Sequence, residues 1–161
     1  LSKGIVDIPL ECVDHAFQYL KSLSQVDQNR CGIIGFSRGS ELALLYAAHF
    51  PTINSVIAVA PSAVVFPGIV NMQPVDKPAW NYKGKPLSYF QAERTMRDTI
   101  SFFKHWALGK PFSGLDAINR NLQNKQQLED KAIPVEEIKA PMMFIAGEMI
   151  MSNLLYISRR K

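Results

Sequence analysis

The stretch that decides the fold reads Cys31-Gly32-Ile33-Ile34-Gly35-Phe36-Ser37-Arg38-Gly39, in a chain of 161 residues. Its first six residues are largely apolar and predict a short buried strand. The run from Glu41 to Phe50 is rich in helix-forming residues and stops before Pro51, which predicts a helix. Ser37 is therefore expected on a sharp turn between a strand and a helix. Gly-x-Ser-x-Gly in this context is typical of a nucleophile elbow, which exposes a serine hydroxyl on a rigid support.

Ser37 and Arg38 have different expected roles in such an elbow. We expect Gly35 and Gly39 to let the strand and the helix approach closely, because neither has a side chain. Since Ser37 precedes a helix, unpaired N–H groups, first that of Arg38, can point at an oxyanion formed by attack on a carbonyl. Ser37 is thus predicted as the nucleophile and the Arg38 backbone N–H as an oxyanion donor. The alternative is a glycine-rich turn in which Ser37 only caps the helix.

Composition bounds the class of protein. The chain suits a single domain, and no apolar stretch is long enough to cross a membrane. The net charge of +4 is dispersed except for Arg159-Arg160-Lys161, which argues against a nucleic-acid partner and is only weakly compatible with an anionic small molecule. Cys12 and Cys31 are expected to be reduced, packed thiols, so a cytoplasmic location is the default. The sequence indicates no oligomeric state.

Cofactor signals are absent from the sequence. It contains no zinc-type spacing of cysteine and histidine, no phosphate-binding glycine loop and no dinucleotide fingerprint, so we expect no metal and no organic cofactor. The N-terminus lacks a signal-peptide pattern and starts at Leu1 rather than at a methionine, so we expect a fragment of a longer protein.

Hydrophobic periodicity predicts an α/β fold with a parallel sheet. The order helix, strand, helix, strand runs from the first helix to the apolar run Ser55 to Ala60, and Pro141 to Gly147 is the last clear strand. The first helix is expected to lie against the sheet. Its apolar face consists of Leu10, Val13, Ala16, Phe17, Leu20 and Leu23.

Prolines interrupt the middle of the chain, residues 64–114, which we interpret as a lid or insertion. Only Tyr89 to Leu108 reads there as a helix, and a polar helix is expected from Asn119 to Lys131. The aromatic residues of the insertion either line an apolar substrate pocket or pack the insertion against the core. They are Phe66, Trp80, Tyr82, Tyr89, Phe90, Phe102, Phe103 and Trp106.

Four segments together resemble the hydrolase domain of the acyl-CoA thioesterase and bile acid-CoA:amino acid N-acyltransferase family. They occur in the family's order and cover most of the chain. They are the elbow Gly35 to Ala43, the segment Val59 to Phe66, the run Trp80 to Leu87, and Ile133 to Pro141 followed by Ala146-Gly147-Glu148.

The resemblance implies an α/β-hydrolase fold with a parallel sheet, helices on both faces and a lid-like insertion, present here as a partial domain over residues 1–161. It implies cleavage of acyl-CoA thioesters through an acyl-enzyme on Ser37, with the Arg38 N–H in the oxyanion hole. Members of the family that transfer the acyl group to amino acids usually carry cysteine at the nucleophile position. Serine at this position therefore favours hydrolysis over transfer.

The other members of a catalytic triad are not evident. The family's aspartate belongs just after Gly147-Glu148, where this sequence has Met149; Glu148 is either a substitute acid or a surface glutamate. His49 and His105 are the histidines that follow Ser37, and neither occupies the late loop of the catalytic histidine. We interpret both, and His15, as structural.

Three functional hypotheses remain open from the sequence. One is a serine thioesterase whose histidine lies beyond Lys161. Another is a non-catalytic relative that keeps the fold as a binding module. The third is a carboxylester or dienelactone-type hydrolase, which shares the elbow and prefers oxygen esters.

Overall fold

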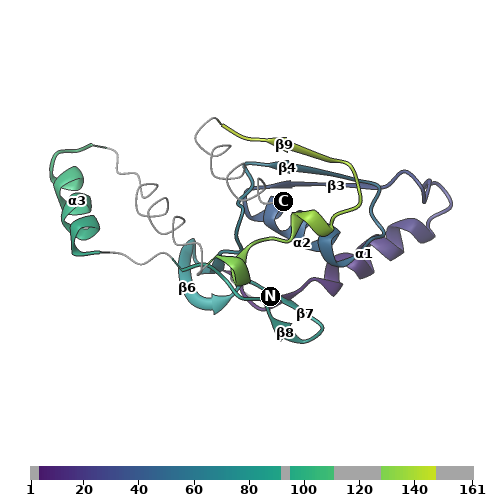
Figure 1. Ribbon diagram of the computed structural model, residues 1–161, viewed down its shortest axis with the longest axis horizontal. Coiled ribbons are helices and arrows are strands. Elements are labelled where there is room, and N and C mark those ends of the chain that lie inside the picture. The colour runs from purple at the N-terminus through teal and green to yellow at the C-terminus, as the bar shows by residue number, and fades with distance from the viewer. Residues whose placement is uncertain (1–3, 92–94, 111–127, 148–161) are drawn as a thin grey trace.

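A parallel three-stranded sheet carries the segment that decides the fold. The computed structural model describes residues 4–91, 95–110 and 128–147. Strands β3 (Gly32–Phe36), β4 (Ser55–Val59) and β9 (Met142–Ile145) pair in the order β3-β4-β9. Both pairings are parallel, and the register aligns Ile34 with Ile57 and Ile57 with Met143. The three strands predicted from apolar runs are thus confirmed, and the protein is a mixed α/β structure (Figure 1).

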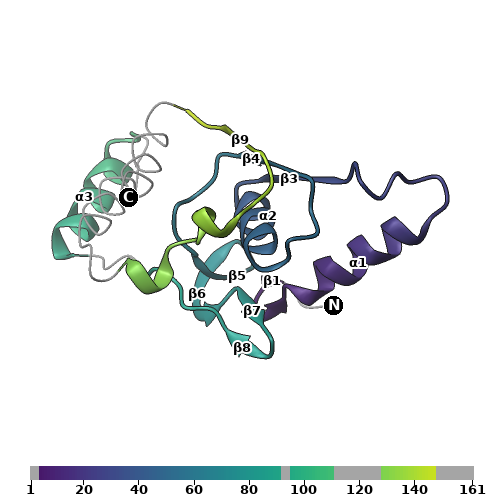
Figure 2. The same ribbon diagram turned by 45° about the vertical axis from the view of Figure 1, so that its right-hand side comes forward.

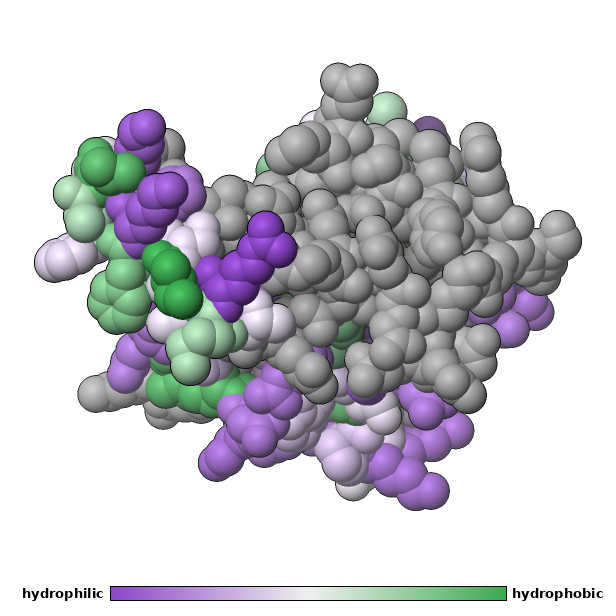
Figure 3. Space-filling view, turned by 60° about the vertical axis from the view of Figure 1, so that its left-hand side comes forward, coloured by the Kyte–Doolittle hydropathy of each residue, from purple (hydrophilic) through white to green (hydrophobic). Residues whose placement is uncertain are grey.

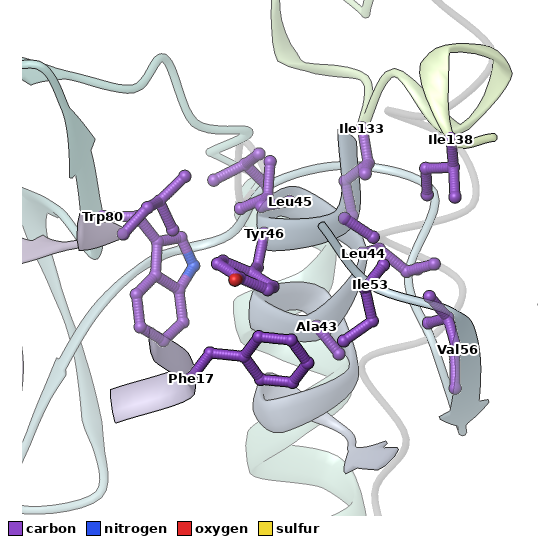
Figure 4. Close-up of a cluster of buried hydrophobic side chains, with 14 of the residues drawn as sticks. Phe17, Ala43, Leu44, Leu45, Tyr46, Ile53, Val56, Trp80, Ile133 and Ile138 are labelled. Carbon is purple, nitrogen blue, oxygen red and sulfur yellow. The ribbon is translucent and has the colours of Figure 1, made fainter. Parts of the chain in front are cut away.

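Helix α2 (Arg38–His49) connects β3 to β4 and packs on one face of this sheet. Most of its residues from Ser40 to Ala47 are buried, because small and aliphatic side chains dominate this part of the helix. Figure 4 shows the core that gathers around it. Labelled there are Phe17, Ala43, Leu44, Leu45, Tyr46, Ile53, Val56, Trp80, Ile133 and Ile138.

The opposite face of the sheet is apolar and open among the described residues. Alternation along β3 places Ile34 and Phe36 on the face opposite Gly35, and these side chains are 59% and 66% exposed. On β9, Met143 and Ile145 continue the same rows, and they are also exposed. The sheet is therefore covered by a described helix on one face only.

Helix α1 (Glu11–Ser22) forms where predicted, but less of its apolar face is buried than expected. Phe17 packs against Tyr46 of α2, with the ring centroids 5.9 Å apart, whereas Ala16 and Leu20 remain exposed. The helix packs on α2 and also contacts the short strand β2 (Ile8–Pro9), and it projects away from the body of the molecule (Figure 2). The predicted helix is therefore confirmed, and β2 is a strand that it contacts.

The structure also contains two smaller sheets that the sequence did not predict. The first joins β1 (Gly4–Ile5), β5 (Pro67–Val70) and β6 (Gln73–Pro78); the second joins β2 (Ile8–Pro9), β7 (Trp80–Tyr82) and β8 (Lys85–Pro86). Four of these strands lie within the predicted insertion. Prolines concealed them, because proline is tolerated at strand ends and on edge strands, which is where Pro67, Pro78 and Pro86 occur.

Helix α3 (Met96–Ala107) is shorter than the predicted helix from Tyr89 to Leu108. It begins after Thr95, whose side chain and that of Asp98 form a reciprocal capping box. Tyr89 and Phe90 precede α3 and lie outside any helix or strand, and the Phe90 N–H donates to the Val65 carbonyl at 2.7 Å.

Most of the predicted polar helix from Asn119 to Lys131 lies outside the described residues. Its described end is the short 3-10 helix η2 (Glu129–Lys131), and η3 (Val135–Glu137) follows before β9.

The aromatic side chains of the insertion differ in burial, and Phe66, Tyr82 and Tyr89 are half-buried. Trp80 and Phe90 are 2% exposed and belong to the core, in agreement with the interpretation that aromatic residues pack the insertion against the core. On α3, Phe103 and Trp106 are exposed. Figure 3 shows hydrophobic residues (green) interspersed with hydrophilic ones (purple) on the surface. None of the helices in residues 4–91, 95–110 and 128–147 is long and apolar enough to span a membrane.

The two cysteines also differ from expectation in one respect. Both are free thiols, as predicted, and Cys31 is buried. Cys12 is exposed, because it lies on the outer side of α1 rather than on the side that contacts α2. The prediction of two packed thiols is therefore correct for Cys31 alone.

Two hairpins provide a stability prediction. Each hairpin has a two-residue turn in which both residues have positive φ angles: Asn71-Met72 in one and Lys83-Gly84 in the other. This is the type I′ geometry, in which glycine is favoured at the second position. Met72 is 87% exposed, so its side chain contributes little packing. We expect Met72→Gly to stabilise the protein by about 1 kcal/mol, measured by urea unfolding. Gly84→Ala should destabilise it by a similar amount, and a stabilising effect there would contradict the argument.

Candidate active site

Ser37 lies on the predicted turn at the carboxyl end of β3. Its backbone has φ 47° and ψ −113°, a conformation that non-glycine residues rarely adopt, and the residue is exposed. Such a conformation costs about 1–3 kcal/mol and persists only where the surroundings enforce it. The Ser37 N–H donates to the Val59 carbonyl of β4 at 2.9 Å, and the Ser37 carbonyl accepts from the Ser40 hydroxyl at 2.6 Å. The Ser37 side chain forms no cap hydrogen bond to the helix, contrary to the capping alternative.

The two glycines of the motif are not equivalent. A Cβ atom at Gly35 would overlap the carbonyl group of Gly39 and lie 2.6 Å from the Ser40 nitrogen. A Cβ atom at Gly39 would meet nothing within 4 Å. The close approach of strand and helix therefore depends on Gly35, and the expectation that Gly39 is needed for it was wrong.

The Arg38 side chain is held by several partners. Its guanidinium donates to Glu41 Oε2 at 2.7 Å and to the carbonyls of Phe66 and Pro67 at 3.2 Å and 2.7 Å. It also lies 5.6 Å from the centre of the Trp80 ring, within the range of a cation–π interaction. Burial lowers the pKa of Arg38, while Glu41 beside it raises the pKa, and the group stays charged.

Glu41 is a buried carboxylate at the centre of this network. It is 1% exposed and accepts from Trp80 Nε1 at 2.6 Å and from the Phe66 N–H at 3.2 Å, in addition to Arg38. Burial raises the pKa of Glu41 to about 6, against the lowering effect of Arg38 and the two N–H donors. The sequence analysis did not predict a role for Glu41 or for its bond to Trp80. An acidic residue amid the apolar run of α2 was the available signal, because buried carboxylates require partners.

This pKa predicts how stability depends on pH. The folded protein binds the Glu41 proton more tightly than the unfolded chain, whose carboxyl has a pKa near 4.5. The contribution of Glu41 is therefore fully present below pH 4.5 and is lost as the pH rises through 6. Between pH 5 and pH 7, the free energy of unfolding should fall by about 1 kcal/mol through this group. Urea unfolding of the wild type and of Glu41→Gln should show this slope in the wild type only, and Glu137→Gln, at an exposed position, should retain it.

The histidines are not at Ser37. His49 ends α2, twelve residues after Ser37, so a helix rise of about 1.5 Å per residue places it roughly 18 Å away. Its ring stacks on Tyr82 with centroids 4.3 Å apart, and burial, together with the charge of Lys83, lowers its pKa. His105 Nδ1 lies 2.8 Å from the Ser101 carbonyl within α3, and His15 is on the exposed side of α1. These positions agree with the structural interpretation of all three.

The candidate acid, Glu148, lies outside the described residues. Glu148 and Met149 fall beyond the described residues, which end at Gly147 in this region. Within the described ranges, no group of three or more histidine, cysteine, aspartate and glutamate side chains is arranged to hold a metal ion. The structure therefore assembles the elbow, Arg38 and Glu41, and brings no described histidine to Ser37.

These features define a class of protein. A parallel β-strand, an exposed serine in a strained conformation and a helix that starts at the next residue form the strand–turn–helix unit of a nucleophile elbow. Residues 8–152 match the family described as BAAT / acyl-CoA thioester hydrolase C terminal. The chain belongs to this family, as the sequence resemblance indicated. None of the curated proteins matches it.

Proposed function

We propose that the protein is a serine hydrolase that cleaves acyl-CoA thioesters through an acyl-enzyme on Ser37. The observation that carries the proposal is the strained, exposed conformation of Ser37 at the start of α2, in a chain of a family named for acyl-CoA thioester hydrolysis. Strain of this kind concentrates at functional sites.

The proposed reaction has two steps. The Ser37 hydroxyl loses its proton to a base and attacks the thioester carbonyl carbon, and the Arg38 N–H donates to the oxyanion. Collapse of this intermediate expels the thiolate of coenzyme A and leaves the acyl group on Ser37. Water then attacks the ester, which releases the carboxylic acid and restores the hydroxyl. The base and its acid come from residues other than the described histidines, none of which lies at Ser37.

The proposed domain is a partial α/β-hydrolase domain over residues 1–161, with residues 64–114 as the lid or insertion. The parallel order β3-β4-β9 and the position of α2 support it. The other face of the sheet is apolar and open, as expected for a face that a second layer covers, because parallel sheets are normally covered on both faces. It includes Ile34, Phe36, Met143 and Ile145. We also propose a cytoplasmic location and a small acyl thioester, rather than nucleic acid or a membrane, as the partner.

A fluorophosphonate probe tests the serine, because labelling requires an activated hydroxyl rather than a serine in a turn. We expect one probe per chain by intact mass for the wild type and none for Ser37→Ala. Ser62→Ala is a matched control, since Ser62 lies in the loop after β4 and its hydroxyl donates to the Val64 carbonyl at 2.6 Å. An unlabelled wild type would contradict the proposal.

Two further substrates separate the remaining hypotheses. Release of free thiol from an acyl-CoA is expected to exceed hydrolysis of the matched oxygen ester, and the reverse preference would favour a carboxylester or dienelactone-type hydrolase. The absence of any described histidine near Ser37 favours one second candidate, a non-catalytic binding module. That candidate predicts acyl-CoA binding with neither labelling nor turnover.

A further inference from the structure

The Arg38 side chain leaves the elbow one residue after Ser37 and ends on a different segment of the fold. We propose that Arg38 and Glu41 are positioning residues, which hold the Ser37–Arg38 turn against Phe66 and Pro67 and so keep the Arg38 N–H aimed at the oxyanion. This inference rests on the proposed function for its use of that N–H. The positioning itself is a property of the folded turn.

The strained turn needs anchors on both sides, and the structure supplies them. On the strand side, the Ser37 N–H is bonded to the Val59 carbonyl at 2.9 Å. On the helix side, the Ser40 hydroxyl holds the Ser37 carbonyl from within α2, and the Arg38 guanidinium ties this end of the helix to a different segment, through the carbonyls of Phe66 and Pro67. Without the Arg38 anchor, the first turn of α2 can relax toward ordinary helical geometry and turn the Arg38 N–H away.

Glu41 makes the Arg38 anchor rigid. The Phe66 N–H donates to Glu41 while the Phe66 carbonyl accepts from Arg38, so both residues of the pair grip the same peptide segment. Trp80 Nε1 donates at 2.6 Å to the same carboxylate oxygen as the Phe66 N–H, Oε1, while Arg38 holds Oε2. The charged groups in this cluster are Arg38 and Glu41 themselves; Phe66, Pro67 and Trp80 contribute peptide groups and an indole N–H.

The shape of the arginine side chain matters to this arrangement. A planar guanidinium presents several N–H groups at fixed angles, so it can reach the carboxylate and the two carbonyls at once. An ammonium group has the same charge but cannot span these acceptors in the same geometry. Arg38→Lys therefore keeps the positive charge next to Glu41 but removes the planar set of N–H donors.

Residue-resolved amide hydrogen exchange of the full chain tests the positioning without requiring activity. In Arg38→Lys, we expect the protection of the Ser37 and Ser40 amides to fall about 10-fold or more. The Phe50 amide, at the far end of α2, and the Val56 amide, in β4, should change less than about 3-fold. Glu41→Gln should produce the same selective loss, and it provides the test if Arg38→Lys does not fold.

Arg30→Lys is the matched control, because Arg30 is exposed on the turn before β3. It should leave the protection of all these amides unchanged. A uniform loss across Ser37, Ser40, Phe50 and Val56 in Arg38→Lys would show a merely structural role. Unchanged protection would show no role, and either result overturns the inference.

Probe labelling relates the positioning to chemistry. In Arg38→Lys, we expect the rate constant of fluorophosphonate labelling to fall about 10- to 100-fold at unchanged probe affinity, the effect of a misplaced catalytic group. If the wild type is not labelled, the proposed function fails while the exchange data still decide the positioning. If labelling persists at the wild-type rate despite selective loss of protection, the positioning does not serve the reaction and the inference is wrong.

Discussion

Replacing Gly35 with alanine should destabilise the protein by about 3 kcal/mol, at the upper end of the range for overpacked sites. The added methyl group would overlap the Gly39 carbonyl and lie 2.6 Å from the Ser40 nitrogen, and both are backbone atoms that no rotamer change can move. Relief requires α2 to shift away from β3, which disrupts the Ser37 turn as well as the core beneath the helix. The measurement is the free energy of unfolding in urea at neutral pH.

The same substitution at Gly39 is the matched control, four residues along the motif. Its Cβ atom meets open space, and Gly39 lies within α2 with an ordinary helical φ. Since alanine is favoured over glycine in helices, Gly39→Ala should stabilise the protein by about 0.5–1 kcal/mol. Equal effects at the two positions would refute the steric asymmetry between them.

Replacing Glu41 with alanine should lower the free energy of unfolding by about 3–5 kcal/mol, the usual cost of removing one partner of a buried ion pair. The substitution leaves the partly buried Arg38 guanidinium without its counter-charge. It also leaves the indole N–H of Trp80, a residue that is 2% exposed, and the Phe66 N–H without an acceptor. Urea unfolding above pH 7, where the Glu41 carboxyl is ionised, measures the full effect.

Two variants control this prediction. Glu137→Ala removes an exposed carboxylate from η3 and should change stability by less than about 0.5 kcal/mol. Glu41→Gln keeps an oxygen acceptor for Trp80 and Phe66 but loses the charge, so its cost should fall between those of the two alanine variants. A loss below about 1 kcal/mol for Glu41→Ala would mean that Arg38 reaches water when its partner is absent.

Local patterns predicted the strands of the parallel sheet and the helix between two of them. Two of the strands are apolar runs of strand length, Cys31 to Phe36 and Ser55 to Ala60. Burial of such a run depends more on its apolar composition than on specific contacts. The same reasoning failed between residues 64 and 91. Short strands with prolines at their ends are stabilised there by pairing with β1 and β2, which lie about sixty to seventy residues earlier in the chain.

The candidate site likewise has one part that the sequence predicted and one part that it did not. Ser37 was predicted from the residues on either side of it, since a strand, a turn and a helix in succession are local features. The partners of Arg38 were not predictable, because Phe66, Pro67 and Trp80 are distant in the sequence and two of them contribute peptide carbonyls that any residue type possesses. No pattern of side chains could reveal them.

The sequence by itself determined the elbow, the family and the alternation that leaves Ile34 and Phe36 opposite Gly35. These follow from short-range geometry, in which spacing along the chain sets direction in space. Only the tertiary structure decided that Gly35 rather than Gly39 is the sterically required glycine, that burial raises the pKa of Glu41 to about 6, and that Arg38 joins the elbow to β5. Steric overlap and desolvation depend on which groups folding brings together, and those groups come from segments far apart in the chain.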